Sequence, residues 1–299
     1  MRKEEDILET TLALAENGYE EAYRFLRDVY EKDAEKCGPQ TLYFLACLAG
    51  GAHLPEEALA WMKKAVRDNG WWYRPEVLED DDLALLKDNV EFAALKDISD
   101  HRYADARSSA KAEFSWRKKT AENLLLAVHG NTQNSRMARE DWQLMMGENR
   151  QWQLETVQSA EPDGCGTYRW SYDTVSCLPV AEALQKARDA GYQRVAGGGF
   201  SAGCDMLLRA MLVSEARCDT LVLQSSWIPI LKEQPEELIK ALGQKRVELK
   251  IFCGSEDEDC LPLAEQLHAL AEQAGLQTAL SIQPGRRHQF PEEPCALFD

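Results

Sequence analysis

The sequence lacks any stretch that approaches the ~20 consecutive apolar residues that a membrane-spanning helix requires. It also lacks the apolar core of a signal peptide near its beginning, where Met-Arg-Lys-Glu-Glu-Asp runs directly into a mixed sequence. We therefore expect neither a membrane span nor a cleaved leader.

Regularly spaced cysteines are also missing. The nine cysteines are odd in number and scattered along the chain, and no Cys-x-x-Cys pair occurs. Disulfide frameworks and structural zinc sites show more regular spacing. The pattern predicts reduced thiols in a cytoplasmic protein and gives no sign of a zinc site.

Positive charge is scarce relative to negative charge. The chain has 34 lysines and arginines against 51 aspartates and glutamates, so its formal net charge is −17. It shows no basic stripe of the kind that binds a phosphate backbone, and we do not expect a nucleic-acid partner. The excess of acidic groups favours solubility and would repel anionic substrates that approach from a distance.

What the chain contains is two sequence patterns in succession. A length of 299 residues with a 44% hydrophobic share suits a globular protein of two domains. From residue 4 to about 115, long amphipathic segments predict paired helices. Between residues 119 and 284, short apolar runs alternate with helical stretches, which predicts an α/β domain with a mostly parallel sheet. The basic run 117–119 marks the junction, and we place a helical domain at 1–118 and an α/β domain at 119–299.

The helical part contains a weak internal repeat. Residues 18–22 and 54–58 both place Glu-Glu before an alanine and then continue with apolar residues at helical spacing. Ala22 and Ala58 lie 36 positions apart (58 − 22), close to the ~34-residue tetratricopeptide period. We expect a helix over 42–50 that is stopped by Gly50-Gly51. The region resembles tetratricopeptide repeats, which implies either a surface for a protein or peptide partner or a helical cap on the other domain.

One candidate nucleophile stands in a glycine-rich turn. Residues 194–203 read as a short strand, a tight turn and the start of a helix, with the pattern Gly199-x-Ser201-x-Gly203 inside it. A serine on such a turn is strained, and glycines two residues before and after it remove collisions with flanking side chains. A nucleotide-binding loop is the competing interpretation. No Gly-x-x-x-x-Gly-Lys-Ser/Thr pattern is present, and no acidic residue ends a following strand, so Ser201 is the stronger candidate.

A serine hydroxyl needs a base to remove its proton, and the chain has five histidines. His53, His101 and His268 lie in segments that predict surface positions. His288 follows the apolar strand expected at 278–282, at the edge of the sheet where active sites of open α/β sheets lie. We therefore expect His288 to be the base.

The base in turn needs a carboxylate, and four acidic residues crowd the loop that follows the strand expected at 247–253. Asp257, three residues after the glycine that ends the strand, is the preferred acid. Asp259 is the first alternative and Glu256 the second.

An early strand, expected at 123–128, ends in His129-Gly130. A pair of this kind marks the loop that donates one backbone N–H to an oxyanion, and the residue after the nucleophile donates the other. This assigns the oxyanion hole to the backbone amides of Asn131 and Ala202. We interpret His129 as structural rather than as a second base.

With His129-Gly130, residues 199–203, 254–257 and 285–288 in this order, the chain from 120 onward resembles the α/β-hydrolase superfamily, particularly compact esterases, dienelactone hydrolases and acyl-peptidases. The resemblance implies an α/β-hydrolase fold and a serine hydrolase that works through an acyl-enzyme without metal or cofactor. Two features depart from the usual pattern. The acidic loop has an extra residue between Asp257 and Pro262, so Asp259 remains an alternative acid. Only residues 227–244 are available to form a lid.

The short lid segment sets the expected substrate. Trp227, Ile228, Pro229 and Ile230 either line a modest apolar pocket or belong to the core. The first interpretation favours a small carboxylic ester with a short or medium acyl chain, and acyl-peptidase or lactone hydrolase activity is the alternative. A hypothesis from another class is a tetratricopeptide scaffold that carries a vestigial hydrolase domain.

Overall fold

The computed structural model describes residues 4–290. The chain forms two compact units. One consists of the chain up to Ala110 together with Pro162–Gly166, and the other of Lys111–Glu161 and the chain from Thr167 onward. We call them the helical unit and the sheet unit.

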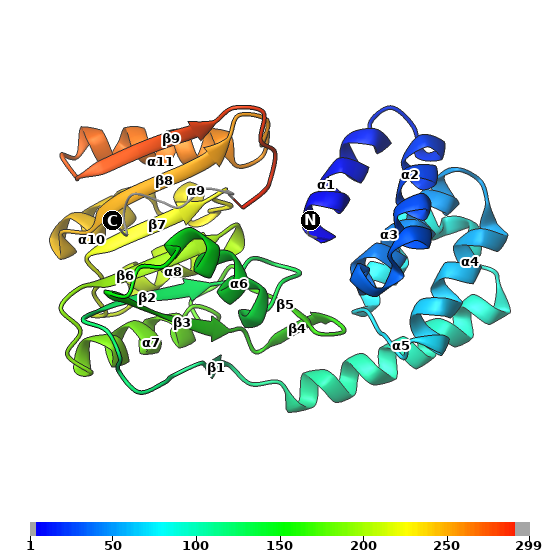
Figure 1. The fold of residues 1–299 in the computed structure, drawn as a ribbon, viewed down its shortest axis with the longest axis horizontal. Coiled ribbons are helices and arrows are strands. Elements are labelled where there is room, and N and C mark those ends of the chain that lie inside the picture. The colour runs from blue at the N-terminus through cyan, green and yellow to red at the C-terminus, as the bar shows by residue number, and fades with distance from the viewer. Residues whose placement is uncertain (1–3, 291–299) are drawn as a thin grey trace. The chain divides into compact units, whose positions relative to one another are not determined.

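The helical unit consists of successive helices, as the amphipathic pattern predicts. Proline opens α3 and α4, and the Asn89 side chain caps the last long helix by accepting from the amides of Glu91 and Phe92. Its elements are α1 (Glu4–Ala15), α2 (Tyr19–Lys32), η1 (Ala34–Lys36), α3 (Pro39–Gly51), α4 (Pro55–Lys63), η2 (Lys64–Asp68), η3 (Pro75–Glu79), η4 (Asp81–Leu86) and α5 (Val90–Ser109) (Figure 1).

Neighbouring helices of this unit pack in sequence order, α1 on α2, α2 on α3 and α3 on α4. Ala22 and Ala58 are both fully buried, which agrees with the need for a small side chain at these positions. Gly50 does not itself end the helix, because α3 continues to Gly51. The structure gives another reason for a glycine at position 50. A Cβ on Gly50 would lie 1.9 Å from the carbonyl oxygen of Asp82, so glycine is required for η4 to pack on α3.

The helical unit also includes a hairpin tip that the sequence did not reveal. Strands β4 (Glu161–Gly164) and β5 (Thr167–Arg169) form this hairpin, and its tip bonds to the segment before η3. The Arg74 guanidinium donates to Asp163 at 2.6 Å, and the Cys165 amide donates to the Trp72 carbonyl at 2.9 Å. Residues distant in sequence thus complete this unit.

The sheet unit contains a seven-stranded sheet with the order β1-β3-β2-β6-β7-β8-β9 (Figure 1). All neighbouring pairs are parallel except β1 with β3, which confirms the predicted, mostly parallel sheet. The strands are β1 (Glu113–Phe114), β2 (Asn123–Val128), β3 (Trp152–Gln158), β6 (Val195–Phe200), β7 (Thr220–Gln224), β8 (Glu248–Gly254) and β9 (Thr278–Gln283).

The alternation of side chains along β2 separates two apolar layers. Leu124, Leu126 and Val128 join the larger cluster, which also contains residues of α7, α8, α10 and α11. Leu125 and Ala127 face the other way and pack with α6. The helices are α6 (Ser135–Met146), α7 (Leu178–Asp189), α8 (Ala202–Val213), α9 (Ile230–Glu233), α10 (Pro235–Lys245) and α11 (Leu261–Gln273).

The division between the units falls at Ala110, earlier than the boundary after residue 118 that the basic run suggests. Strand β1 explains the difference, because Glu113 and Phe114 pair with β3 and so belong to the sheet. Within the part of the chain that the structure describes, no helix has the length and apolar character needed to cross a bilayer. The eight cysteines in that part are all free thiols.

Candidate active site

Ser201 lies at the turn between β6 and α8, where the sequence predicts a strained serine. Its backbone has φ 51° and ψ −122°, a left-handed φ that is unusual for a residue other than glycine. Close approaches surround the turn. A Cβ on Gly199 would lie 2.7 Å from the Cys204 amide, and one on Gly203 would lie 2.4 Å from the Val128 carbonyl oxygen. The two glycines therefore allow the sharp turn that holds Ser201.

The turn lies where the strand order of the sheet reverses. Strands β2 and β6 are parallel neighbours, and the chain continues from β2 to β3 on one side and from β6 to β7 on the other. The crevice at such a point, beyond the carboxyl ends of the strands, is where open α/β sheets bind ligands. Gly130, two residues past β2, would place a Cβ 3.2 Å from the Cβ of Ser201. The β2 loop and the serine turn are thus in close contact.

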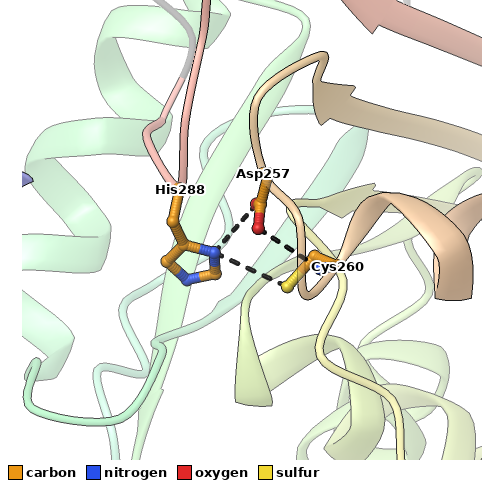
Figure 2. A group of neighbouring side chains, drawn as sticks. All are labelled: Asp257, Cys260 and His288. Carbon is orange, nitrogen blue, oxygen red and sulfur yellow. Dashed lines mark hydrogen bonds and ion pairs between the residues drawn. The ribbon is translucent and has the colours of Figure 1, made fainter. Parts of the chain in front are cut away.

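His288 and Asp257 meet at the same edge of the sheet. The Nδ1 atom of His288 lies 2.9 Å from Oδ2 of Asp257 (Figure 2). The Asp257 residue is 4% exposed, whereas the His288 side chain is 31% exposed. A neutral imidazole that donates its Nδ1 proton to a buried carboxylate keeps Nε2 as an acceptor, which is the tautomer that a general base requires.

Backbone contacts hold the two loops together. A Cβ on Gly254 would lie 2.1 Å from the Arg286 carbonyl oxygen, so glycine at the end of β8 permits the close approach of the histidine loop. The Glu256 amide donates to the Arg286 carbonyl at 2.8 Å, and the Ser255 amide donates to the Gln283 carbonyl at 2.9 Å. These bonds place Asp257 against His288.

The Asp257 carboxylate is maintained in its charged form by its partners. Burial by itself raises the pKa of this carboxyl, but the hydrogen bond and charge of His288 oppose burial. The backbone amide of Cys260, 3.2 Å from Oδ1, and the hydroxyl of Ser225 also lower the pKa. The net result is a pKa below the ordinary value of an aspartate.

The alternative acids lie elsewhere in the loop. Glu256, Glu258 and Asp259 are exposed, while Asp257 is buried beside the histidine. The extra residue before Pro262 is accommodated in the turn, where the Leu261 amide donates to the Asp257 carbonyl at 2.9 Å. The geometry therefore favours Asp257 over Asp259 and Glu256.

His288 also adjoins the residue next to Ser201. The rings of His288 and Phe200 have centroids 5.1 Å apart at an interplanar angle of 44°. Phe200 is the last residue of β6, and Ser201 follows it directly. This contact brings the histidine loop to the serine turn, so the three predicted residues gather at one edge of the sheet. Ser201 itself is partly exposed.

Two backbone amides are available as oxyanion donors. Among residues 4–290, the structure gives no acceptor to the amide of Asn131 or to that of Ala202, which begins α8. The Asn131 side chain holds its loop in place. Its Oδ1 accepts from the Trp170 amide at 2.8 Å, and its Nδ2 donates to the Tyr172 hydroxyl at 3.0 Å.

His129 is a buried structural residue. It is 0% exposed, its Nδ1 donates to the Gly130 carbonyl at 2.7 Å, and its Nε2 accepts from the Ser159 amide at 3.2 Å. Its ring stacks on Trp170 with centroids 4.9 Å apart. Burial lowers the pKa of His129 to about 4, so the ring is neutral near pH 7.

The other histidines lie away from this edge. His53 and His101 are exposed in the helical unit. His268, on α11, has Nδ1 3.0 Å from the Thr278 hydroxyl. His53 and His101 thus have the surface positions that the sequence predicts, and the side chain of His268 is partly exposed.

The short lid segment is partly core. Ile228 and Ile230 are buried in the large apolar cluster, whereas Trp227 is only partly buried against it. A buried ion pair anchors the segment to α8, because Asp205 accepts from the Ile230 amide at 2.9 Å and from Arg209 at 2.5 Å. Only Trp227 and Pro229 of the four predicted pocket residues therefore retain exposed surface.

Sequence reasoning missed three residues of this site. Ser225 follows β7, has φ 43°, and bonds to Asp257. Cys260 contacts both Asp257 and His288, and Tyr172 holds Asn131. Ser225 directly follows a strand and Cys260 lies in the acidic loop, so their positions in the sequence could have indicated them. Tyr172 comes from a loop that carries no motif.

Residues 3–107 match the family model described as A/B hydrolase-like, N-terminal domain. This match covers the helical region, and the tetratricopeptide resemblance of the same region stays a prediction. No curated protein matches the sequence.

Among solved structures, an uncharacterized protein from Bacillus cereus is 25% identical, with 97% of this chain and 94% of that chain covered and a TM-score of 0.53. A Bacillus cereus carboxylesterase is 17% identical over 64% of this chain and 92% of its own, with a TM-score of 0.44. Acyl-protein thioesterase 2 from Zea mays is 15% identical over 60% and 92%, also with a TM-score of 0.44. The last two are too distant to inform on activity. The chain has an α/β-hydrolase fold, preceded by a helical region that matches the N-terminal domain of A/B hydrolase-like proteins.

Proposed function

We propose that the sheet unit is a serine hydrolase in which Ser201 is the nucleophile, His288 the general base and Asp257 the acid that orients it. The observation that carries the proposal is the buried Asp257 carboxylate at 2.9 Å from Nδ1 of a partly exposed histidine, beside the strained turn of Ser201. Each side chain comes from a different strand end, as a site of this kind requires.

The chemistry proceeds in two steps. His288 Nε2 takes the proton of the Ser201 hydroxyl while the oxygen attacks the carbonyl carbon of the substrate. The amides of Asn131 and Ala202 stabilise the negative oxygen of the tetrahedral intermediate, and removal of one such donor typically costs about 3–4 kcal/mol. The leaving alcohol takes the proton from His288, and water, activated by the same ring, then hydrolyses the acyl-enzyme.

The substrate that we propose is a small carboxylic ester with a short or medium acyl chain. Only α9, with four residues, and α10 connect β7 to β8, so little chain is available to cover a long acyl group. The partly exposed Trp227 offers apolar contact near the site edge of β7. The net charge of −17 disfavours anionic substrates. Acyl-peptidase and lactone hydrolase activity would use the same residues.

Replacement of the nucleophile tests the proposal. We expect Ser201→Ala to lower kcat for p-nitrophenyl butyrate by at least about 10⁴-fold, because the nucleophile is lost while binding remains. Labelling by a fluorophosphonate probe should disappear with it, since only an activated serine reacts. Ser214→Ala is the matched control, because Ser214 is a partly exposed serine that follows the other end of α8. Undiminished turnover in Ser201→Ala would refute the assignment, and absence of labelling in the wild type would favour the scaffold hypothesis.

A substrate panel tests the finer assignment. We expect kcat/KM to be highest for acetyl to hexanoyl esters and to fall for longer chains. Better turnover of N-acylated peptides or of lactones than of any ester would replace the esterase assignment while leaving the serine mechanism in place.

A further inference from the structure

Three potential metal ligands converge behind the proposed base. His288 Nδ1, Asp257 Oδ2 and Cys260 Sγ belong to one group in which the ligand atoms all lie within 4.8 Å of one another. Figure 2 shows the imidazole, carboxylate and thiol directed toward a common point. Asp257 and Cys260 are buried, while the histidine side chain is 31% exposed. We propose that these three side chains bind a divalent, thiophilic cation such as Zn²⁺, and that the bound ion shuts off the hydrolase site.

The distances suit a tetrahedral ion. With bonds of about 2.0 Å to nitrogen and oxygen and about 2.3 Å to sulfur, nitrogen and sulfur ligands lie about 3.6 Å apart, and nitrogen and oxygen ligands about 3.3 Å apart. In the structure, His288 Nδ1 lies 3.5 Å from Cys260 Sγ and 2.9 Å from Asp257 Oδ2. A movement of a few tenths of an ångström would therefore complete three corners of a tetrahedron. The exposed side of the imidazole leaves the fourth corner to water.

The composition of the group favours zinc over magnesium or calcium. Thiolate and imidazole are ligands of Zn²⁺, whereas Mg²⁺ and Ca²⁺ take oxygen ligands. Within residues 4–290, the other group of this kind consists of Cys47, Asp80 and Asp82, and it contains no histidine.

The inhibitory part of the inference rests on the proposed function. In the tautomer in which His288 donates to Asp257, the Nδ1 proton lies between the imidazole and the carboxylate, whose atoms are 2.9 Å apart. Binding of the ion to Nδ1 releases this proton and the thiol proton of Cys260 to solvent. A neutral imidazole coordinated through Nδ1 carries its remaining proton on Nε2, the atom that must accept the proton of Ser201. The metal-bound protein therefore has no base for its nucleophile.

Co²⁺ provides a spectroscopic test of the site that does not depend on catalysis. Titration of the metal-free, thiol-reduced full-length protein with Co²⁺ should give one equivalent with thiolate-to-metal charge-transfer absorption and the strong visible bands of tetrahedral cobalt. Added Zn²⁺ should displace it. Cys260→Ser should abolish the charge-transfer band and weaken binding at least about tenfold, and His288→Gln should weaken it similarly.

Two matched cysteine variants serve as controls. Cys253 is buried with its sulfur 3.9 Å from Asp257 Oδ2 but lies outside the ligand group, and Cys47 belongs to the other group. Cys253→Ser and Cys47→Ser should keep the band. Its absence in the wild type, its persistence in Cys260→Ser, or its equal loss in Cys253→Ser would overturn the site. Thermal melting checks that each variant is folded, and His288→Gln keeps the test decisive should Cys260→Ser fail to fold.

Hydrolysis measurements test the consequence separately. Zn²⁺ should inhibit p-nitrophenyl butyrate turnover by the wild type, and EDTA should restore it. The Zn²⁺ concentration for half-inhibition, relative to the metal-free rate of each variant, should rise at least about tenfold in Cys260→Ser. Thiolate-bound Co²⁺ with undiminished turnover would overturn the shut-off. A protein without hydrolase activity would refute the proposed function, while the Co²⁺ spectrum would still decide the metal site.

Discussion

The loops after β2 and β9 each carry a histidine, yet the structure gives the two rings opposite surroundings. His129 is fully buried, and both of its ring nitrogens are bonded to backbone or side-chain groups of the sheet unit. His288 keeps 31% of its side chain exposed, and its Nδ1 lies 2.9 Å from a buried carboxylate. Because both ring nitrogens of His129 are hydrogen-bonded, this ring stabilises its loop. The ring of His288 has an oriented Nδ1 and access to solvent, so it can exchange protons.

The electrostatic difference follows from the same contacts. Burial without a charged partner lowers the pKa of His129 to about 4. His288 faces Asp257, whose own pKa is lowered in spite of burial, so the carboxylate is charged and favours a positive ring beside it. Four changes would break or sharpen this contrast.

The largest effect should come from the exposed ring. We expect His288→Gln to lower kcat for p-nitrophenyl butyrate at least about 10⁴-fold, because the variant loses the base that we propose for Ser201. His268→Gln, on α11, is the matched control and should retain wild-type turnover. Steady-state kinetics on folded protein measure both. Near-normal activity of His288→Gln would show that His288, like His129, is not the base.

Removal of the negative charge beside His288 should have the next largest effect. We expect Asp257→Asn to lower kcat about 10³–10⁴-fold, since the amide no longer stabilises the charged ring or fixes its tautomer. Asp259→Asn changes an exposed residue of the same loop and should alter kcat by less than about twofold. A large loss of kcat in Asp259→Asn and a small one in Asp257→Asn would make Asp259 the acid that orients His288.

The buried ring should dominate stability at mildly acidic pH. The folded pKa of His129, about 4, lies below its ordinary value of 6.5, so the unfolded chain binds a proton first as the pH falls. Stability should therefore decrease by up to about 3 kcal/mol from pH 6.5 to pH 4 and stay level in this respect above pH 7.

Urea unfolding at a series of pH values measures this dependence. His129→Gln should be less stable at pH 7 and should show a flatter pH profile than the wild type. An unchanged slope between pH 4 and 6.5 in the variant would show that other groups cause the loss.

The smallest effect should come from the support of the β2 loop. Tyr172→Phe removes the hydroxyl that accepts from Asn131 at 3.0 Å and keeps the ring. We expect kcat to fall about fivefold, which corresponds to the ~1 kcal/mol of one hydrogen bond, with little change in KM. Tyr192→Phe is the control, because the buried Tyr192 hydroxyl has no hydrogen-bond partner among the described residues. Equal effects of the two variants would argue against a role of Tyr172 at the oxyanion loop.

Local signals were sufficient for most of the fold. The segments expected as strands at 123–128 and 278–282 coincide closely with β2 and β9. Strand β2 is buried along its whole length, as is typical of a central parallel strand, whereas β9 lies at the edge of the sheet and is only partly buried. The hairpin of β4 and β5 was not predicted, because its short strands contain charged residues and its tip is stabilised by Arg74 of the helical unit. Long-range contacts of this kind leave no periodic pattern in the sequence.

The sequence by itself determined the order of the elements and the identity of the chemical groups. Glycines around Ser201, a histidine after the last strand and acids after the strand before it are local requirements of turns and strand ends. Those requirements act within a few residues and so can be read without a fold.

Only the tertiary structure decided which acid faces His288, which histidine is buried, and that Cys260 lies 3.5 Å from the same ring. The acidic residues 256–259 have similar local sequence surroundings, and the chain separates Cys260 from His288 by a helix and a strand. Burial and proximity depend on how β8, α11 and β9 pack, because side-chain environments are set by neighbours distant in sequence.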